Sequence, residues 1–378
     1  MSVADRRERV RARMAAVGVD LLAVAPGADL RYLLGVTPHP DERCCIVLLG
    51  PERIACCMPA LNALEFHHGV GDLPVAVFPW NDADGPDEAL DAALDAAGLA
   101  PGRLRLAMGA AMRVDHALAL ERALSRAGVL AWPPAALSTD VVAPVRMRKD
   151  PEELAALAGS AAVADTAMER AIACLAVGVR ESDVSQAAAA AFAAQGAAMA
   201  FGLVAAGPAS AEPHHPPGPR PVGEDEAVFL DIGGDHFGYQ SDLTRMAFVG
   251  RPDARFREVY DTVRRACDAG LAAVRVGAQA ADVDRAARKV IDDAGYGPHF
   301  VHRTGHGIGL EGHEPPSMQA GDATVLDVGM AFSIEPGIYL PGAFGVRIED
   351  IIVVEADGGR RLSRLGHDVA IIDAREGR

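Results

Sequence analysis

Two aspartates in the middle of the chain have a spacing that could serve chemistry. Asp231 follows the apolar residues Phe229 and Leu230 and precedes two glycines, and Asp242 begins a second run eleven positions later. A hairpin between the two runs would bring both carboxylates together. Aspartates are also ordinary turn residues, because their side chains bond to the nearby backbone. The pair alone therefore fits either a functional site or a simple turn.

A glycine-rich segment further along the chain carries three histidines, His302, His306 and His313. Glycine lets a backbone approach a site closely, and imidazole can bind a metal or carry a proton near neutral pH. A surface loop would explain the same composition.

Two glutamates, Glu335 and Glu349, lie inside apolar runs that are typical of strands. A buried carboxylate is costly without a cation, and the nearby arginines are too few to neutralise four acids. Four carboxylates and one imidazole favour Mn²⁺, Co²⁺ or Fe²⁺ over a structural zinc. Five ligands exceed the need of one ion, and two ions about 3.5–4 Å apart could share a hydroxide that attacks a carbonyl.

These residues together resemble the pita-bread metallopeptidases, the family of Xaa-Pro dipeptidase (prolidase), aminopeptidase P and methionine aminopeptidase. The resemblance covers nearly the whole chain. It implies two divalent ions, with Mn²⁺ preferred and Co²⁺, Fe²⁺ or Zn²⁺ as alternatives. In that family the metals are held by the series Asp, Asp, His, Glu, Glu, which falls here on Asp231, Asp242, His306, Glu335 and Glu349 without a substitution.

The resemblance also implies catalytic roles. A hydroxide that bridges the metals would attack the scissile carbonyl, and Glu335 would relay its proton to the proline nitrogen. His313 and His302 would stabilise the oxyanion and position the substrate.

Substrate contacts are implied in the same way. His214 lies 17 positions before Asp231, the family spacing, and is chosen over its neighbour His215 as the histidine that faces the substrate. Arg347 is expected at the substrate site, and both Arg245 and Arg347 are expected to orient carboxylates.

The implied reaction is hydrolysis of the peptide bond before a proline in second position. The gap of 14 positions between Glu335 and Glu349 is short, as in compact bacterial and archaeal prolidases, which favours dipeptides over the longer peptides of aminopeptidase P. A non-peptide hydrolase or lyase, such as an ectoine hydrolase or a sulfonium lyase, is an alternative on the same scaffold. A binding module without activity is disfavoured because all five ligands are present.

The elements that must position these residues form two predicted domains: a smaller α/β creatinase-like domain over 1–143 and an α+β pita-bread domain over 144–378. The segment Arg31–Gly35 resembles the creatinase-type domain, which methionine aminopeptidases generally lack. Periodicity and turn residues predict, in chain order, a helix over Val3–Val17 ended by Gly18, strands at Leu21–Ala25, Cys45–Leu49 and Ile54–Met58, a helix near Glu88–Ala97, a strand at Leu104–Met108 and a helix from Asp115.

The sequence of the second domain contains the signal for the start of a helix and an internal repeat. Asp150, Pro151 and Glu153 provide an N-cap, a proline in the first helical position and a capping glutamate. Val177–Gly178 and the later Gly196 recur 99 positions on as Val276–Gly277 and Gly295. Two similar halves would make this domain pseudo-symmetric.

Composition limits the partners. A net charge of -16 disfavours nucleic acid, which is bound by displacing phosphate counterions with Lys and Arg. No apolar run is long enough for a membrane span and no secretory signal is seen, so a cytoplasmic protein is expected. The six cysteines show no C-x-x-C spacing and are expected to be reduced core residues.

A homodimer is the expected assembly, because two-domain relatives of this kind form dimers. The segment Thr37–Asp41 is the candidate contact that would close the partner's substrate pocket. A solvent-exposed turn is the alternative.

Overall fold

The computed structural model describes residues 2–98, 102–130 and 136–374. The chain divides into two compact units, Met1–Arg146 and Met147–Arg378. The short helix α7 (Ala143–Arg146) spans the predicted boundary between 143 and 144, and all of it groups with the first unit.

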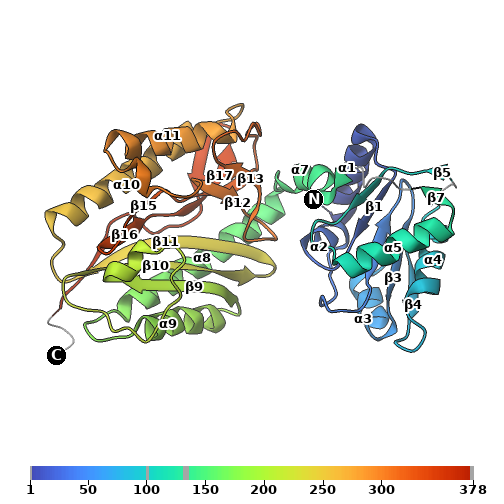
Figure 1. Cartoon of the computed structure of the whole chain (residues 1–378), viewed down its shortest axis with the longest axis horizontal. Helices are drawn as coiled ribbons and strands as arrows, with labels where there is room; N and C mark the ends of the chain where they lie inside the picture. Colours follow the sequence, from blue (N-terminus) through green and yellow to red (C-terminus); the bar gives the residue numbers. More distant parts are fainter. Residues whose placement is uncertain (1, 99–101, 131–135, 375–378) are drawn as a thin grey trace. The chain divides into compact units, whose positions relative to one another are not determined.

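The first unit is a mixed sheet of six strands with helices packed on it (Figure 1). The sheet order is β4-β3-β2-β1-β6-β8, and β5 and β7 form a separate pair. The strands are β1 (Leu21–Val24), β2 (Ile46–Leu49), β3 (Ile54–Pro59), β4 (Val75–Trp80), β5 (Gly102–Arg103), β6 (Leu106–Met108), β7 (Val129–Leu130) and β8 (Ala136–Leu137). The helices are α1 (Val3–Val17), α2 (Ala28–Leu34), α3 (Ala60–Val70), α4 (Asp87–Ala96), α5 (Val114–Arg126) and α6 (Ser138–Val141).

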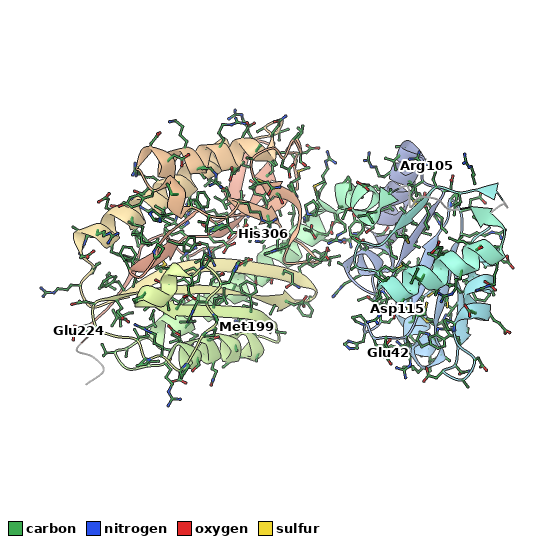
Figure 2. All side chains as sticks on the ribbon, in the orientation of Figure 1. Glu42, Arg105, Asp115, Met199, Glu224 and His306 are labelled. Atoms are coloured by element: carbon green, nitrogen blue, oxygen red, sulfur yellow. The ribbon has the colours of Figure 1, made fainter. Side chains whose placement is uncertain are left out.

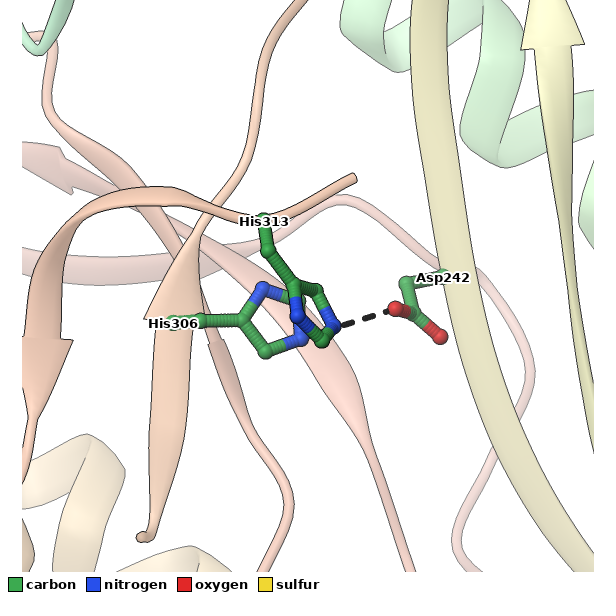
Figure 3. A group of neighbouring side chains, drawn as sticks. All are labelled: Asp242, His306 and His313. Atoms are coloured by element: carbon green, nitrogen blue, oxygen red, sulfur yellow. Dashed lines mark ion pairs between the residues drawn. The ribbon is translucent and has the colours of Figure 1, made fainter. Parts of the chain in front are cut away.

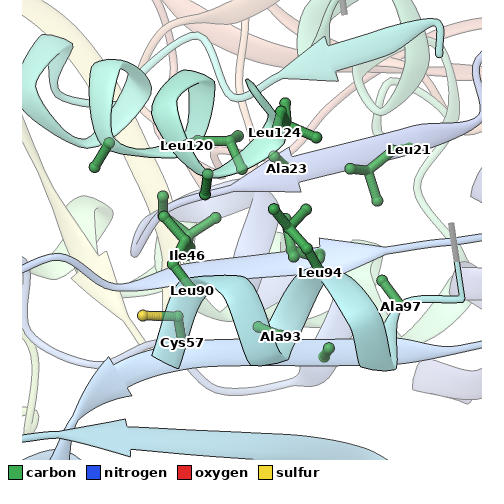
Figure 4. Close-up of a cluster of buried hydrophobic side chains, with 14 of the residues drawn as sticks. Leu21, Ala23, Ile46, Cys57, Leu90, Ala93, Leu94, Ala97, Leu120 and Leu124 are labelled. Atoms are coloured by element: carbon green, nitrogen blue, oxygen red, sulfur yellow. The ribbon is translucent and has the colours of Figure 1, made fainter. Parts of the chain in front are cut away.

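Local signals account for the elements of this unit. A capping box between Ser2 and Asp5 begins α1, and Gly18 ends it in the left-handed conformation at φ 68°, as predicted. Leucines of α4 and α5, among them Leu90 and Leu120, pack on the sheet (Figure 4). Burying each such side chain contributes about 1.5–3 kcal/mol.

The second unit contains two helical pairs on opposite sides of its strands (Figure 1). Its helices are α8 (Pro151–Ala173), α9 (Glu181–Ala194), α10 (Ala254–Ala273) and α11 (Ala280–Asp293), with 3-10 turns η1 (Gly207–Ala211) and η2 (Gly297–His299). The first sheet has the order β19-β11-β10-β9 and consists of β9 (Ala198–Ala206), β10 (Glu226–His236), β11 (Tyr239–Val249) and β19 (Ala370–Ile372). The second has the order β13-β12-β14-β17-β18 and consists of β12 (Gly305–Gly307), β13 (Glu314–Met318), β14 (Ala331–Ile334), β17 (Asp350–Glu355) and β18 (Gly358–Arg361), beside the hairpin of β15 (Gly337–Leu340) and β16 (Phe344–Arg347).

The predicted helix start and repeat are both confirmed. Asp150 and Glu153 form a capping box at the start of α8, with proline in its first turn. Helices α9 and α11 both have 14 residues and begin 99 positions apart. Gly178 and Gly277, which turn the chain before them, have φ angles of 88° and 87°. The two helical pairs are therefore equivalent parts of a pseudo-symmetric unit.

Two further expectations concern helices and thiols. Among the described residues, no helix is both long and apolar enough to cross a membrane. The six cysteines are free thiols; five are buried and Cys174 is partly exposed.

Candidate metal centre

The hairpin of β10 and β11 positions the two aspartates. Its register pairs Asp231 with Thr244 and Asp242 with Gly233. Because side chains alternate along a strand and cross-strand partners share a face, both carboxylates project from the same face. A side chain at Gly233 would overlap the main-chain oxygen of Ser241 and the ring of Phe201. The glycine therefore permits the close approach that this pairing requires.

Hydrogen bonds donated by their backbone amides position the other three predicted ligands. His306 lies on β12, and its amide donates to Ser333 Oγ over 3.0 Å. Glu335 follows β14 and Glu349 precedes β17; their amides donate to the main-chain oxygens of Thr304, over 2.8 Å, and of Thr244, over 3.2 Å. The two sheets are thereby joined at the site.

The structure brings all five predicted ligands together. The donor atoms of Asp231, Asp242 and Glu349 lie within 4.8 Å of one another, as do those of His306, Glu335 and Glu349. His306 Nε2 is 3.3 Å from Glu335 Oε1 and 3.6 Å from Asp242 Oδ2. His306 lies inside the second unit (Figure 2), and Figure 3 shows its ring facing Asp242 across the site.

The buried carboxylates of this cluster need a cation. Burial, followed by the charge of neighbouring acids, raises the pKa of Asp242 and Glu349 well above the usual range. Burial also raises the pKa of Glu335 to about 7. Asp231 Oδ1 and Glu349 Oε1 are buried and have no hydrogen-bond partner, although buried acceptors are normally satisfied. Divalent ions fit this donor set, because these oxygens and His306 Nε2 are the ligands they prefer.

Arg347 lies behind the carboxylates and is only 3% exposed. It pairs with Asp231, donates to Tyr339 Oη over 2.7 Å and donates to the main-chain oxygen of Pro213 over 3.2 Å. It therefore fixes the carboxylate of Asp231, a predicted ligand, and also holds the residue before His214.

Arg245 differs from its expected role. It pairs with Asp350 over 2.7 Å and donates to the main-chain oxygen of Glu349 over 2.6 Å. It reaches the backbone of one predicted ligand rather than a ligand carboxylate. The reason is the alternation of β11, which places Arg245 on the face opposite to Asp242 and Thr244.

Tyr339 is a site residue that the sequence analysis missed. His302 Nδ1 lies 2.7 Å from the main-chain oxygen of Arg303, and Nε2 lies 2.8 Å from Tyr339 Oη. Because a carbonyl can only accept, Nδ1 carries the hydrogen and Nε2 accepts from the phenol. Burial lowers the pKa of His302 to about 4, which keeps the ring neutral. Both nitrogens are then occupied, so the structure supports a positioning role for His302 and leaves it no N–H for an oxyanion.

His313 lies at the exposed side of the cluster, where its ring centroid is 3.8 Å from that of His306. Its ring nitrogen also falls within 4.8 Å of donor atoms of Asp242 and His306. Arg303, a second residue that was missed, places Nη2 3.4 Å from His313 Nδ1. Burial and then the charge of Arg303 lower the pKa of His313.

The two neighbouring histidines His214 and His215 face different surroundings. His214 is close enough to His302 and His313 to contribute to lowering the pKa of both rings. His215 instead lies 3.2 Å from Glu212 and 3.7 Å from Glu181. This arrangement favours His214 for contact with a substrate.

The chain is similar to known proteins over 98% of its length. Residues 155–356 match the model of metallopeptidase family M24, and residues 6–147 match the creatinase/prolidase N-terminal domain. A probable dipeptidase PepE of Mycobacterium tuberculosis is 39% identical over 373 residues, which cover 98% of this chain and 96% of that protein. An Xaa-Pro dipeptidase of Lactobacillus helveticus is 39% identical over 251 residues, 65% of this chain and 68% of that protein. The crystal structure of a prolidase from Thermococcus sibiricus superposes with a TM-score of 0.89 and 30% identity, covering 98% of this chain and 100% of that one.

Proposed function

The chain belongs to metallopeptidase family M24, and we propose that it hydrolyses the Xaa-Pro bond of dipeptides with two divalent ions. The observation that carries this proposal is the convergence of four carboxylates and His306, with buried oxygens of Asp231 and Glu349 left without a partner. The Xaa-Pro dipeptidase and prolidase similar to this chain support proline as the second residue.

Metal ions bound here would polarise the scissile carbonyl and activate the attacking water. We assign the transfer of the proton of the attacking water to Glu335, which lies inside the cluster. Its Oε1 lies 3.3 Å from His306 Nε2 and accepts from Ser333 Oγ over 3.1 Å. A proline nitrogen in a peptide bond has no hydrogen. When the C–N bond breaks, this nitrogen leaves as an amine and takes up a proton. Glu335 would accept that proton from the attacking water and deliver it to the nitrogen.

His313 is suited to stabilise the negative charge on the carbonyl oxygen. A guanidinium only donates hydrogen bonds, so the contact from Arg303 Nη2 makes Nδ1 of His313 an acceptor. In the neutral ring the hydrogen then resides on Nε2, which can donate to a substrate oxygen. His214 would contact the proline side of the substrate, and His302 would fix the position of the proline ring.

The sequence and the resemblance also support a metal, an assembly and a cellular location. Mn²⁺ is the preferred metal, the chain forms a homodimer in which Thr37–Asp41 approaches the partner's site, and the enzyme acts in the cytoplasm. The carboxylate-rich ligand set supports Mn²⁺.

The test is a substrate panel with purified enzyme of known metal content. The panel contains Leu-Pro, Leu-Pro-Gly, Leu-Ala and an acetylated amide that is not a peptide. We expect Leu-Pro to be cleaved fastest in the presence of Mn²⁺. Preferred cleavage of Leu-Pro-Gly would replace the dipeptidase with an aminopeptidase P activity, and cleavage of the amide alone would refute a peptidase specific for proline.

A further inference from the structure

One face of helix α11 is bonded to the segment that carries His302. Arg288 Nη1 donates to the main-chain oxygen of Phe300 over 3.1 Å, and Nη2 donates to that of His302 over 2.8 Å. The guanidinium also lies 4.1 Å from the centroid of the Phe300 ring. A planar guanidinium can make two such directed bonds at once, which an ammonium cannot match.

Asp284, one turn earlier on α11, holds the end of the same segment. Its Oδ1 accepts from the amide of Thr304 over 3.2 Å and from Thr304 Oγ1 over 2.7 Å. The carboxylate is 2% exposed and pairs with Arg288 over 3.1 Å. Asp284 and Arg288 therefore act as one unit on the segment 300–304, because the buried carboxylate of Asp284 needs a cation and the partly exposed Arg288 supplies it.

Two contacts connect the segment held by Asp284 and Arg288 to the candidate metal centre. The ring of Phe300 lies edge-on against His302 with centroids 5.2 Å apart, and the main-chain oxygen of Thr304 accepts the amide of Glu335 over 2.8 Å. His302 must keep its backbone in place for Nε2 to stay 2.8 Å from Tyr339 Oη. A small displacement of the segment would break that bond.

We propose that Arg288 and Asp284 are positioning residues of the active site, with Arg288 acting through His302 and Asp284 acting through Thr304. Neither residue belongs to the groups of side chains that could hold a metal ion, and neither is assigned a contact with the substrate. The inference rests on the proposed hydrolysis of Xaa-Pro bonds. It adds two residues of helix α11, which hold the segment 300–304 in place, to the residues already described at the site.

The experiment compares Arg288→Gln with Arg288→Lys and with the control Arg285→Gln. Arg285 lies on the same helix and pairs with Asp282 over 2.6 Å, with 70% of its side chain exposed. We expect Arg288→Gln to lower kcat/KM for Leu-Pro about ten- to a hundredfold, as removal of a support behind a metal site does. Arg288→Lys should retain part of the activity, and Arg285→Gln should match the wild type.

A double-mutant cycle separates positioning from a general loss of stability. In the His302→Ala background, Arg288→Gln should cost less than about threefold, because the residue through which it acts is gone. An equal loss in both backgrounds would overturn the proposal. Hydrogen exchange supplies a readout that does not depend on activity: the amide of Thr304 should exchange faster in Asp284→Asn than in the wild type.

The two proposals fail differently. A wild-type enzyme that does not cleave Leu-Pro contradicts the proposed function. A wild-type enzyme that cleaves it while Arg288→Gln behaves like Arg285→Gln, with equal unfolding temperatures, contradicts the positioning role alone.

Discussion

Replacement of His313 by alanine should separate the chemistry of this site from its metal binding. His313 is the exposed member of the cluster, and its contacts are the ring of His306 and Arg303 Nη2. The substitution removes the proposed donor to the carbonyl oxygen and leaves the four carboxylates and His306 unchanged. We expect a large loss of kcat and little change in metal content.

The expected magnitudes differ enough to be measured independently. Loss of one oxyanion donor costs roughly 10²–10³ in kcat, or about 2.7–4 kcal/mol. The stability loss should be smaller, because an exposed substitution usually changes the free energy of unfolding by under about 0.5 kcal/mol and the ring contact adds about 0.5–1.5 kcal/mol. For a domain of about 150–250 residues, the size class of the second unit, 1 kcal/mol corresponds to a shift in unfolding temperature of about 2–4 °C.

The assay measures turnover of Leu-Pro and bound metal in the same sample of His313→Ala. Loss of metal in parallel with activity would show that His313 is a ligand, for which its ring nitrogen is near enough to Asp242 and His306. Wild-type turnover would show that His313 is a bystander. Either result would refute the role proposed for it.

Three other predictions concern the metals and Glu335. Chelation should abolish hydrolysis and Mn²⁺ or Co²⁺ should restore it, whereas full activity of a verified metal-free sample would contradict metal dependence. Glu335→Gln should lower kcat by roughly 10²–10⁴ even where metal remains, and an unchanged kcat would exclude the proton relay. Because burial raises the pKa of Glu335 from 4.5 to about 7, the folded metal-free chain holds a proton that the unfolded chain releases. Below about pH 6.5 the lowered pKa values of His302 and His306 act in the opposite direction. The unfolding temperature of the metal-free chain should therefore fall as pH rises from about 6.5 to 8, where the buried acids lose their protons; a rise over that range would contradict the buried acidic cluster.

Local signals in the sequence were sufficient for much of the fold. The predicted stop at Gly18 and the predicted cap at Asp150 act within a few residues, and the structure shows both. The 99-residue repeat was visible because the turns before α9 and α11 need glycine at positive φ. Strand β4 was not predicted, because it contains Pro79. A proline is tolerated there since β4 is at the edge of its sheet.

Acids inside apolar strand runs made Glu335 and Glu349 conspicuous in the sequence, and the resemblance to the metallopeptidases supplied the full set of five predicted ligands. The residues that orient the site could not be found in this way. Tyr339 and Arg303 have no unusual local pattern, and Asp284 with Arg288 looks like an ordinary ion pair on a helix surface. Their roles depend on hydrogen bonds to segments that only the folded chain brings near, such as that from Arg288 to His302.

The charge of the site argues for two divalent ions rather than one. Among the described residues, four carboxylates surround His306, whose pKa burial lowers to about 3, and Arg347 is the arginine paired with them. Four ionised acids against one guanidinium leave three negative charges. One divalent ion would leave the site negative, which would oppose the negative charge that develops on the carbonyl oxygen. Two ions bring the four acids and Arg347 to one positive charge, which the attacking hydroxide neutralises. A site without excess negative charge does not oppose the charge that develops on the carbonyl oxygen, and His313 can donate to that oxygen.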